Sequence, residues 1–163
     1  MSTAKNTIVR EIGRKSIFES AFNVTDSAVS YNQGDLLVFN ATTHKIVKPS
    51  AESEGSTFLG TAVVTVVNGK LKSPYSTSND AAIQPSDIPG PAYGVSALVK
   101  LKNGDALASG EPVYLYPAGG EQHVQVAGTK AIGVYQGKNV TGGTDTNIEV
   151  LLGARYYGDV LKF

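Results

Sequence analysis

Several residue types are absent or scarce in this chain of 163 residues, and each absence excludes a class of chemistry. Cysteine is absent, which excludes disulfide bonds, thiolate metal sites and a cysteine nucleophile. The chain has only two histidines, His44 and His123, and neither belongs to a sequence cluster of metal-ligating residues. We therefore interpret both histidines as exposed residues at strand ends, and the sequence predicts no metal site and no cofactor.

The charge balance and the hydrophobic pattern exclude two kinds of partner. Lysine and arginine total 14, and aspartate and glutamate total 14, so the net charge is zero. Binding nucleic-acid phosphates requires a basic excess, so nucleic acid is not an expected partner. No apolar run approaches the roughly 20 residues that cross a bilayer, and residues 1–7 lack the apolar segment of a signal peptide. We therefore expect a protein that is made in the cytoplasm and does not enter a membrane.

The residues that are present favour an all-β fold. Short runs of Val, Ile, Thr, Tyr and Phe are separated by Gly, Pro, Asn and Asp, which is typical of strands and turns. Asn68-Gly69 and Asn103-Gly104 each follow such a run and predict two-residue hairpins, because Asn-Gly accepts the positive φ angles of a type I′ turn. Alternation within residues 93–102 predicts a strand with one buried face and one wet face. The expected strands are residues 36–40, 45–48, 58–67, 93–102, 112–116, 123–126, 131–136 and 148–152.

An internal repeat is the most informative feature of the organisation. Residues 31–39 and 107–115 share one pattern: an apolar residue, two spacers, glycine, an acid and an apolar strand. The glycine predicts a turn with positive φ, and we expect the acid, Asp35 or Glu111, to accept backbone N–H groups of that turn. The alternative is a catalytic acid/base pair. We favour the turn role, because each acid recurs inside the same motif without a catalytic companion nearby.

The repeat predicts one β domain over residues 21–163, preceded by an extended N-terminal arm over residues 1–20. We expect the domain to be a compact β-barrel or β-sandwich, of the β-tulip or β-clip kind, built from two related lobes. Within the arm, a short helical stripe is the alternative to an extended conformation. The predicted parts of the domain are lobe one at residues 25–72, a proline-rich loop at 73–91, lobe two at 92–153 and a C-terminal tail at 154–163.

Two terminal segments hold the candidate partner-binding residues. In the arm, the apolar residues could add a strand to an exposed edge of a partner sheet, and the basic residues could meet an acidic surface. An unattached chain end is the other interpretation. The tail either packs back on its own barrel or docks on a neighbour. The candidates are Ile8, Val9, Arg10, Ile12, Arg14 and Lys15 in the arm, and Tyr156, Tyr157 and Phe163 in the tail.

The repeated glycine–acid step, followed by an apolar-glycine step and a closing strand, resembles the small capsid decoration (cement) proteins of tailed bacteriophages. The resemblance covers residues 25–153. It implies a virion protein that binds the outside of an expanded capsid as a homotrimer and bridges neighbouring capsomers of the major capsid protein. It implies no catalytic residues. The motifs that carry it are Gly34-Asp35, Gly60-Thr61-Ala62, Gly94-Val95-Ser96, Gly110-Glu111 and Gly133-Val134.

Two other functional classes stay open at this point. A phage fibre or host-surface module that binds glycans would show exposed aromatic platforms and a low copy number on the particle. A trimeric β enzyme would show polar residues that converge on a subunit boundary. The sequence contains no nucleophile elbow and no P-loop. We therefore expect a structural protein and not an enzyme.

Overall fold

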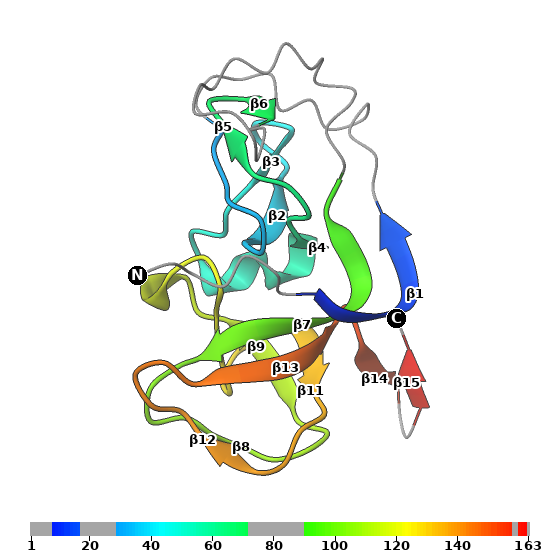
Figure 1. The fold of residues 1–163 in the computed structure, drawn as a ribbon, viewed down its shortest axis with the longest axis vertical. Coiled ribbons are helices and arrows are strands. Elements are labelled where there is room, and N and C mark those ends of the chain that lie inside the picture. Colours follow the sequence, from blue (N-terminus) through cyan, green and yellow to red (C-terminus); the bar gives the residue numbers. More distant parts are fainter. Residues whose placement is uncertain (1–7, 17–28, 72–89, 158–159, 163) are drawn as a thin grey trace.

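The computed structural model describes residues 8–16, 29–71, 90–157 and 160–162, and these residues are mostly β-structure. The all-β prediction is confirmed. Two short 3-10 helices are described, η2 (Glu52–Thr57) and η4 (Pro117–Gly119). Within the described ranges, no helix is long and apolar enough to span a membrane. Figure 1 shows the strands: β1 (Ile8–Ser16), β2 (Leu36–Asn40), β3 (Lys45–Val47), β4 (Phe58–Thr61), β5 (Val66–Val67), β6 (Lys70–Leu71), β7 (Ala92–Leu101), β8 (Ala106–Leu107), β9 (Pro112–Leu115), β10 (His123–Gln125), β11 (Ala131–Tyr135), β12 (Val140–Thr141), β13 (Asn147–Leu152), β14 (Arg155–Tyr157) and β15 (Val160–Lys162).

Five strands close into a small β-barrel, which forms the lower half of the view in Figure 1. The order around the barrel is β7, β13, β11, β9 and β10. All neighbours in this ring are antiparallel except β10 and β7, whose parallel pairing closes it. Closure removes the free edges that an open sheet of these strands would present.

Strand β7 connects the barrel to the rest of the sheet. Its end pairs with β13 and β10, whereas its start pairs with β4 and with the N-terminal strand β1. The predicted buried face is confirmed, since Val95, Ala97, Val99 and Leu101 are all buried. The predicted solvent-exposed face is confirmed only in part. Ser96 is fully buried, because it lies between residues of β1 and β13 in the register.

One hydrophobic core serves both halves of the molecule. Its main cluster combines Leu36, Val38 and Phe58 from the upper strands with buried side chains of every barrel strand. Helix η2 adds a polar contact, in which Glu52 Oε1 accepts the backbone N–H of Thr129 at 2.8 Å. A second cluster of buried residues fills the upper end, below β5: Val29, Tyr31, Leu37, Ile46, Ala62 and Val66.

The repeated turn has the geometry that the sequence predicts. Gly34 and Gly110 have φ angles of 93° and 86°. In each copy the glycine N–H donates to the carbonyl of a residue later in the chain, at 2.8 Å to Ala62, just after β4, or 2.7 Å to Tyr135, at the end of β11. That residue then donates its own N–H back to the carbonyl of the acid. The two turns are therefore built by the same hydrogen bonds, although they lie in different parts of the sheet.

The two Asn-Gly pairs have different outcomes. Asn68 and Gly69 have φ angles of 51° and 72°, and they connect β5 to β6 as a two-residue hairpin, as predicted. The second prediction is wrong, because the strand after Asn103-Gly104 does not return along β7; β8 pairs with β12 instead. The reason is a third copy of the glycine–acid turn, in which Gly104 N–H donates to the carbonyl of Gly142.

The predicted strand over residues 58–67 is also divided. It forms β4 and β5, and the segment between them leaves the ladder. The cause is Ala62, whose backbone groups pair with the turn at Gly34 and Asp35 and not with a neighbouring strand. Further along, Val66 forms an isolated bridge with Tyr31. A continuous apolar run therefore serves two different neighbours.

Candidate functional site

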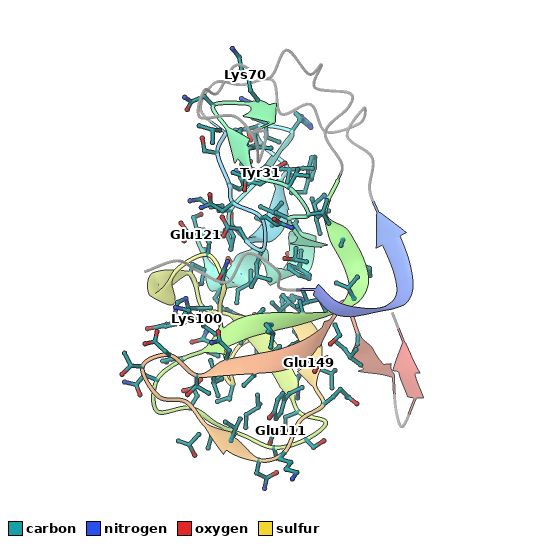
Figure 2. The ribbon with its side chains drawn as sticks, in the orientation of Figure 1. Tyr31, Lys70, Lys100, Glu111, Glu121 and Glu149 are labelled. Atoms are coloured by element: carbon teal, nitrogen blue, oxygen red, sulfur yellow. The ribbon has the colours of Figure 1, made fainter. Side chains whose placement is uncertain are left out.

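A polar pocket lies where the turn before β2 meets the barrel. Its volume is about 160 Å³. The turn contributes acceptor groups, the end of β7 contributes a lysine, and the segment from η4 into β10 contributes the remaining wall. Figure 2 labels Glu121 and Lys100 on this flank of the molecule. The lining residues are Asn32, Asp35, Lys100, Gly119, Gly120, Glu121, Gln122 and His123.

Asp35 is the buried acid of this pocket. The residue is 4% exposed, and its Oδ2 accepts the backbone N–H of Asn32 at 2.8 Å. Burial raises the pKa of Asp35 above its usual value, and the nearby Glu121 carboxylate acts in the same direction. Hydrogen bonds from the Asn32 backbone and the Gln122 side chain oppose this change without reversing it. The sequence prediction that Asp35 caps its own turn is confirmed.

The other charged groups near the pocket have their own partners. Lys48 Nζ lies 2.6 Å from Glu121 Oε1, and this ion pair lowers the pKa of Glu121. Lys100 Nζ lies 3.5 Å from Asp145 Oδ1. Neither of these two ion pairs includes Asp35. Within the described ranges, no cluster of three or more His, Asp or Glu residues could hold a metal ion.

The two histidines lie in different environments. His44 is exposed at the end of β2–β3, with a φ of 53°, as predicted for a residue at a strand end. The prediction for His123 is wrong, because this residue is half-buried and lines the pocket. Its backbone N–H donates to the Gly120 carbonyl at 3.1 Å, which folds the ring into the wall. Burial lowers the pKa of His123, and the Lys100 ammonium lowers it further.

Asp35 makes the stability of the protein depend on pH in a definite direction. Because folding raises its pKa, the folded state binds a proton more readily than the unfolded chain between pH 3.8 and the folded pKa. The Asp35 contribution therefore falls as the pH rises through that window, by at most about 1.4 kcal/mol per pH unit. We expect Asp35→Asn to remove this dependence, so the variant gains stability relative to the wild type as the pH rises from 3.8 through the folded pKa of Asp35.

Urea denaturation of both proteins across this pH range measures the difference directly. His123 titrates in both proteins, so its contribution cancels in the comparison. The contribution of Glu121 cancels only in part, because its carboxylate interacts with that of Asp35. Glu111→Gln is the matched control, because Glu111 has the same place in the second turn but is exposed. A wild type and an Asp35→Asn variant that keep a constant difference in unfolding free energy would contradict the assignment.

The structure does not bring Asp35 and Glu111 together. Glu111 lines a separate groove of about 350 Å³ beside β8 and β12, and its Oε2 accepts the N–H of Ala108 at 2.6 Å. Each carboxylate serves its own turn, so the acid/base pair considered above has no geometric basis. The groove is lined by Ala106, Leu107, Ala108, Glu111, Asn139, Val140 and Thr141.

The structure places the candidate arm residues in strand β1. The strand pairs with β7 in antiparallel orientation, with irregular register between Ile8 and Arg10 and between Glu11 and Lys15. Lys15 lies opposite Tyr93 in this ladder. The partner of β1 in this structure is thus a strand of its own chain. The candidates that β1 contains are Ile8, Val9, Arg10, Ile12, Arg14 and Lys15.

The C-terminal candidates form part of a hairpin. Tyr156 and Tyr157 belong to β14, where they pair with Leu161 and Val160 of β15. Strand β14 also contacts the barrel strand β11. The tail therefore folds back toward its own barrel, which is one of the two alternatives that the sequence left open. Phe163, the last candidate, lies outside the described residues.

Tyr93 connects the two terminal elements, and sequence reasoning did not identify it as a site residue. Its hydroxyl donates to the carbonyl of Gly153 at 3.1 Å, two residues before β14 begins. Because Lys15 pairs with Tyr93 in the backbone ladder, Tyr93 connects the end of β1, through its backbone, to the residue that lies just before the hairpin, through its hydroxyl. Beside it, Ser96 Oγ donates to Glu149 Oε1 on the outer face of the barrel. No local sequence pattern indicates either contact.

A small apolar cluster on this side of the barrel is separate from the main core. Val134, Leu151 and Ala154 are 1%, 5% and 0% exposed. Leu151 alternates with Val150 and Leu152, whose side chains belong to the main core, so it lies on the opposite face of β13. The barrel wall near β14 is thus covered on both faces.

No protein-family model and no curated protein sequence matches this chain.

Proposed function

We propose that this chain is a structural virion protein that binds the outside of an expanded phage capsid and stabilises it by bridging neighbouring capsomers. The observation that carries the proposal is that Tyr93, on a strand of one closed barrel, pairs with β1 through its backbone and holds Gly153, just before the β14–β15 hairpin, through its hydroxyl. A closed barrel that carries a strand and a hairpin at its side is suited to bridging two neighbouring capsomers through surface contacts, and this role requires no catalytic group. The sequence resemblance points to the same role.

Strand β1 is the proposed contact with the shell. It pairs with the first part of β7, and it precedes every other described strand. A terminal strand has backbone N–H and C=O groups with which it can extend a partner sheet. The basic residues of β1 then favour an acidic capsid surface. In this proposal the partner is the major capsid protein, and the protein acts as a homotrimer.

Trimerisation and repetition on the shell supply the retention that one short contact lacks. Linking several weak contacts raises the effective concentration of each, and it increases retention by roughly 10²–10⁴-fold. The charge balance of the chain fits this role, because many copies at zero net charge do not repel one another over the shell. The protein is made in the host cytoplasm and is located on the outer capsid surface of the virion.

We also infer that the two lobes descend from one β unit and form a β-tulip-like or β-clip-like body. The support is the glycine–acid turn, which recurs with the same hydrogen bonds at Gly34 and Gly110. The direct test of the functional proposal is the number of copies of this chain on purified particles of its source phage, measured against the major capsid protein.

A further inference from the structure

The pocket beside β2 contains a buried carboxylate that has no cation of its own. Asp35 accepts two hydrogen bonds, from the Asn32 N–H and from the Gln122 side chain. Among the residues that the structure describes, it forms no ion pair. The nearest lysines are committed elsewhere, Lys48 to Glu121 and Lys100 to Asp145. A carboxylate held in this way is costly to bury, and a cation supplied from outside would offset that cost.

Three backbone donors of the segment from η4 into β10 are already used, which limits the ligands that the pocket can take. Gly119 N–H donates to the Tyr116 carbonyl at 3.0 Å, and Gly120 N–H donates to the Pro117 carbonyl at 3.0 Å. His123 N–H donates to the carbonyl of Gly120. These groups cannot form the nest of free N–H donors that binds an anion. The acceptor oxygens of Asp35 remain, so the pocket is suited to a donor.

The charges around the pocket favour a cation in the same way. Among the described residues of the lining, the one lysine is Lys100, and Asp145 offsets its charge from 3.5 Å. Glu121 is negatively charged and pairs with Lys48, so it does not oppose the binding of a cation. His123 stays neutral near pH 7, because burial and Lys100 lower its pKa. Among the described charged groups of the pocket, Asp35 is thus the one without an ion pair, although Lys48 also acts on it electrostatically.

We propose that this pocket binds a guanidinium or ammonium group, with the Asp35 carboxylate as the anion that receives it and Gln122 and Asn32 holding that carboxylate in place. The volume of about 160 Å³ admits such a head group. It is below the roughly 300–1,000 Å³ of pockets for drug-sized ligands. The occupant is therefore the end of an arginine or lysine side chain, or a small free cation of the same chemistry. For the side-chain source, the inference rests on the proposed function and deepens it, since the side chain would belong to a capsid subunit.

Binding is tested on the isolated full-length protein with methylguanidinium chloride as the probe and sodium chloride at equal ionic strength as the reference. We expect saturable shifts of the backbone NMR signals of Asn32, Asp35, Gln122 and His123. Asp35→Asn should weaken binding by at least about tenfold, because a charge-assisted hydrogen bond is lost. The matched control is Glu111→Gln, which removes the carboxylate of the equivalent turn outside the pocket and should bind like the wild type.

A second measurement keeps the test valid if Asp35→Asn does not fold. In the wild type, a bound cation must favour the ionised carboxylate and so lower the pKa of Asp35 measured by carboxyl NMR. Absence of saturable shifts, equal binding by Asp35→Asn and wild type, or an unchanged Asp35 pKa with the probe present would each overturn the inference.

The particle assay distinguishes the two sources of the cation. If Asp35→Asn loses both probe binding and particle occupancy, while Glu111→Gln keeps both, the occupant is a capsid side chain. If it loses probe binding but occupies particles like the wild type, the occupant is a free cation. Probe binding by a protein that particles lack would support the pocket and remove the proposed function, so the two failures are distinguishable. A probe that does not bind overturns the pocket whatever the occupancy.

Discussion

Gly60→Ala is expected to lower the free energy of unfolding by about 2–5 kcal/mol. Gly60 lies in β4 with a φ of 132°, a conformation that residues with a Cβ rarely adopt. An added Cβ would overlap the backbone carbonyl of Ala92, the first residue of β7. The three nearest atoms all belong to the backbone of Ala92 and Tyr93, which leaves little room for relaxation. The strand pair that would be disturbed, Thr61 with Ala92, joins the upper strands to β7.

Gly104→Ala is the matched control for this substitution. Gly104 also has a positive φ, 86°, but a Cβ there would meet no atom within 4 Å. Its cost is therefore the backbone conformation alone, about 1–2 kcal/mol. Urea denaturation followed by circular dichroism measures both variants. Equal losses at the two glycines would contradict the close approach of β4 to β7.

Deletion of residues 1–16 is expected to reduce occupancy of expanded capsids by at least about tenfold. The deletion removes β1, the strand that we propose to contact the shell, and leaves every barrel strand in place. In an assay with purified capsids that lack this protein, the deleted and full-length chains are mixed with the shells and co-sedimented. The loss follows from multivalency, because each lost contact weakens every other contact of the same trimer.

Two controls separate loss of contact from loss of fold. The deletion exposes the edge of β7 that pairs with β1, so its thermal melting is compared with that of the full-length chain. A combined Arg10→Glu, Arg14→Glu and Lys15→Glu variant keeps the strand but reverses its charges, and it should bind weakly with a reduced salt dependence. A folded deletion variant that occupies capsids like the full-length chain would remove β1 from the interface.

Local patterns in the sequence predicted most of the fold. The strand Leu36–Asn40 is found where the apolar run after the glycine–acid turn indicates it, and the turns at Gly34 and Gly110 have the predicted φ angles and carboxylate hydrogen bonds. These features depend on a few neighbouring residues. The hairpin at Asn103-Gly104 failed for the opposite reason. Its backbone groups are satisfied by Gly142, 38 positions later, and the dipeptide contains no information about that partner.

The pocket shows the same limit at the level of function. It combines the turn at Asn32–Asp35 with Lys100 and with residues 119–123, which are far apart in the sequence. The local sequence predicts that His123 is an exposed residue at a strand end. Its burial beside the η4 turn depends on tertiary packing, which the local sequence does not reveal. The link from Tyr93 to Gly153 spans 60 positions. Side chains that act through such distant contacts have no local periodicity, so the topology had to be known before they could be found.

The copy number on purified particles tests the central claim most directly. The chain is quantified against the major capsid protein in gradient-purified particles of its source phage, with stable-isotope peptide standards for both proteins. Our account predicts a copy number comparable to that of the capsid protein. It also predicts that particles that lose this chain lose their resistance to heat. A handful of copies would contradict it and favour a fibre or host-surface module, and absence from particles would remove a virion role altogether.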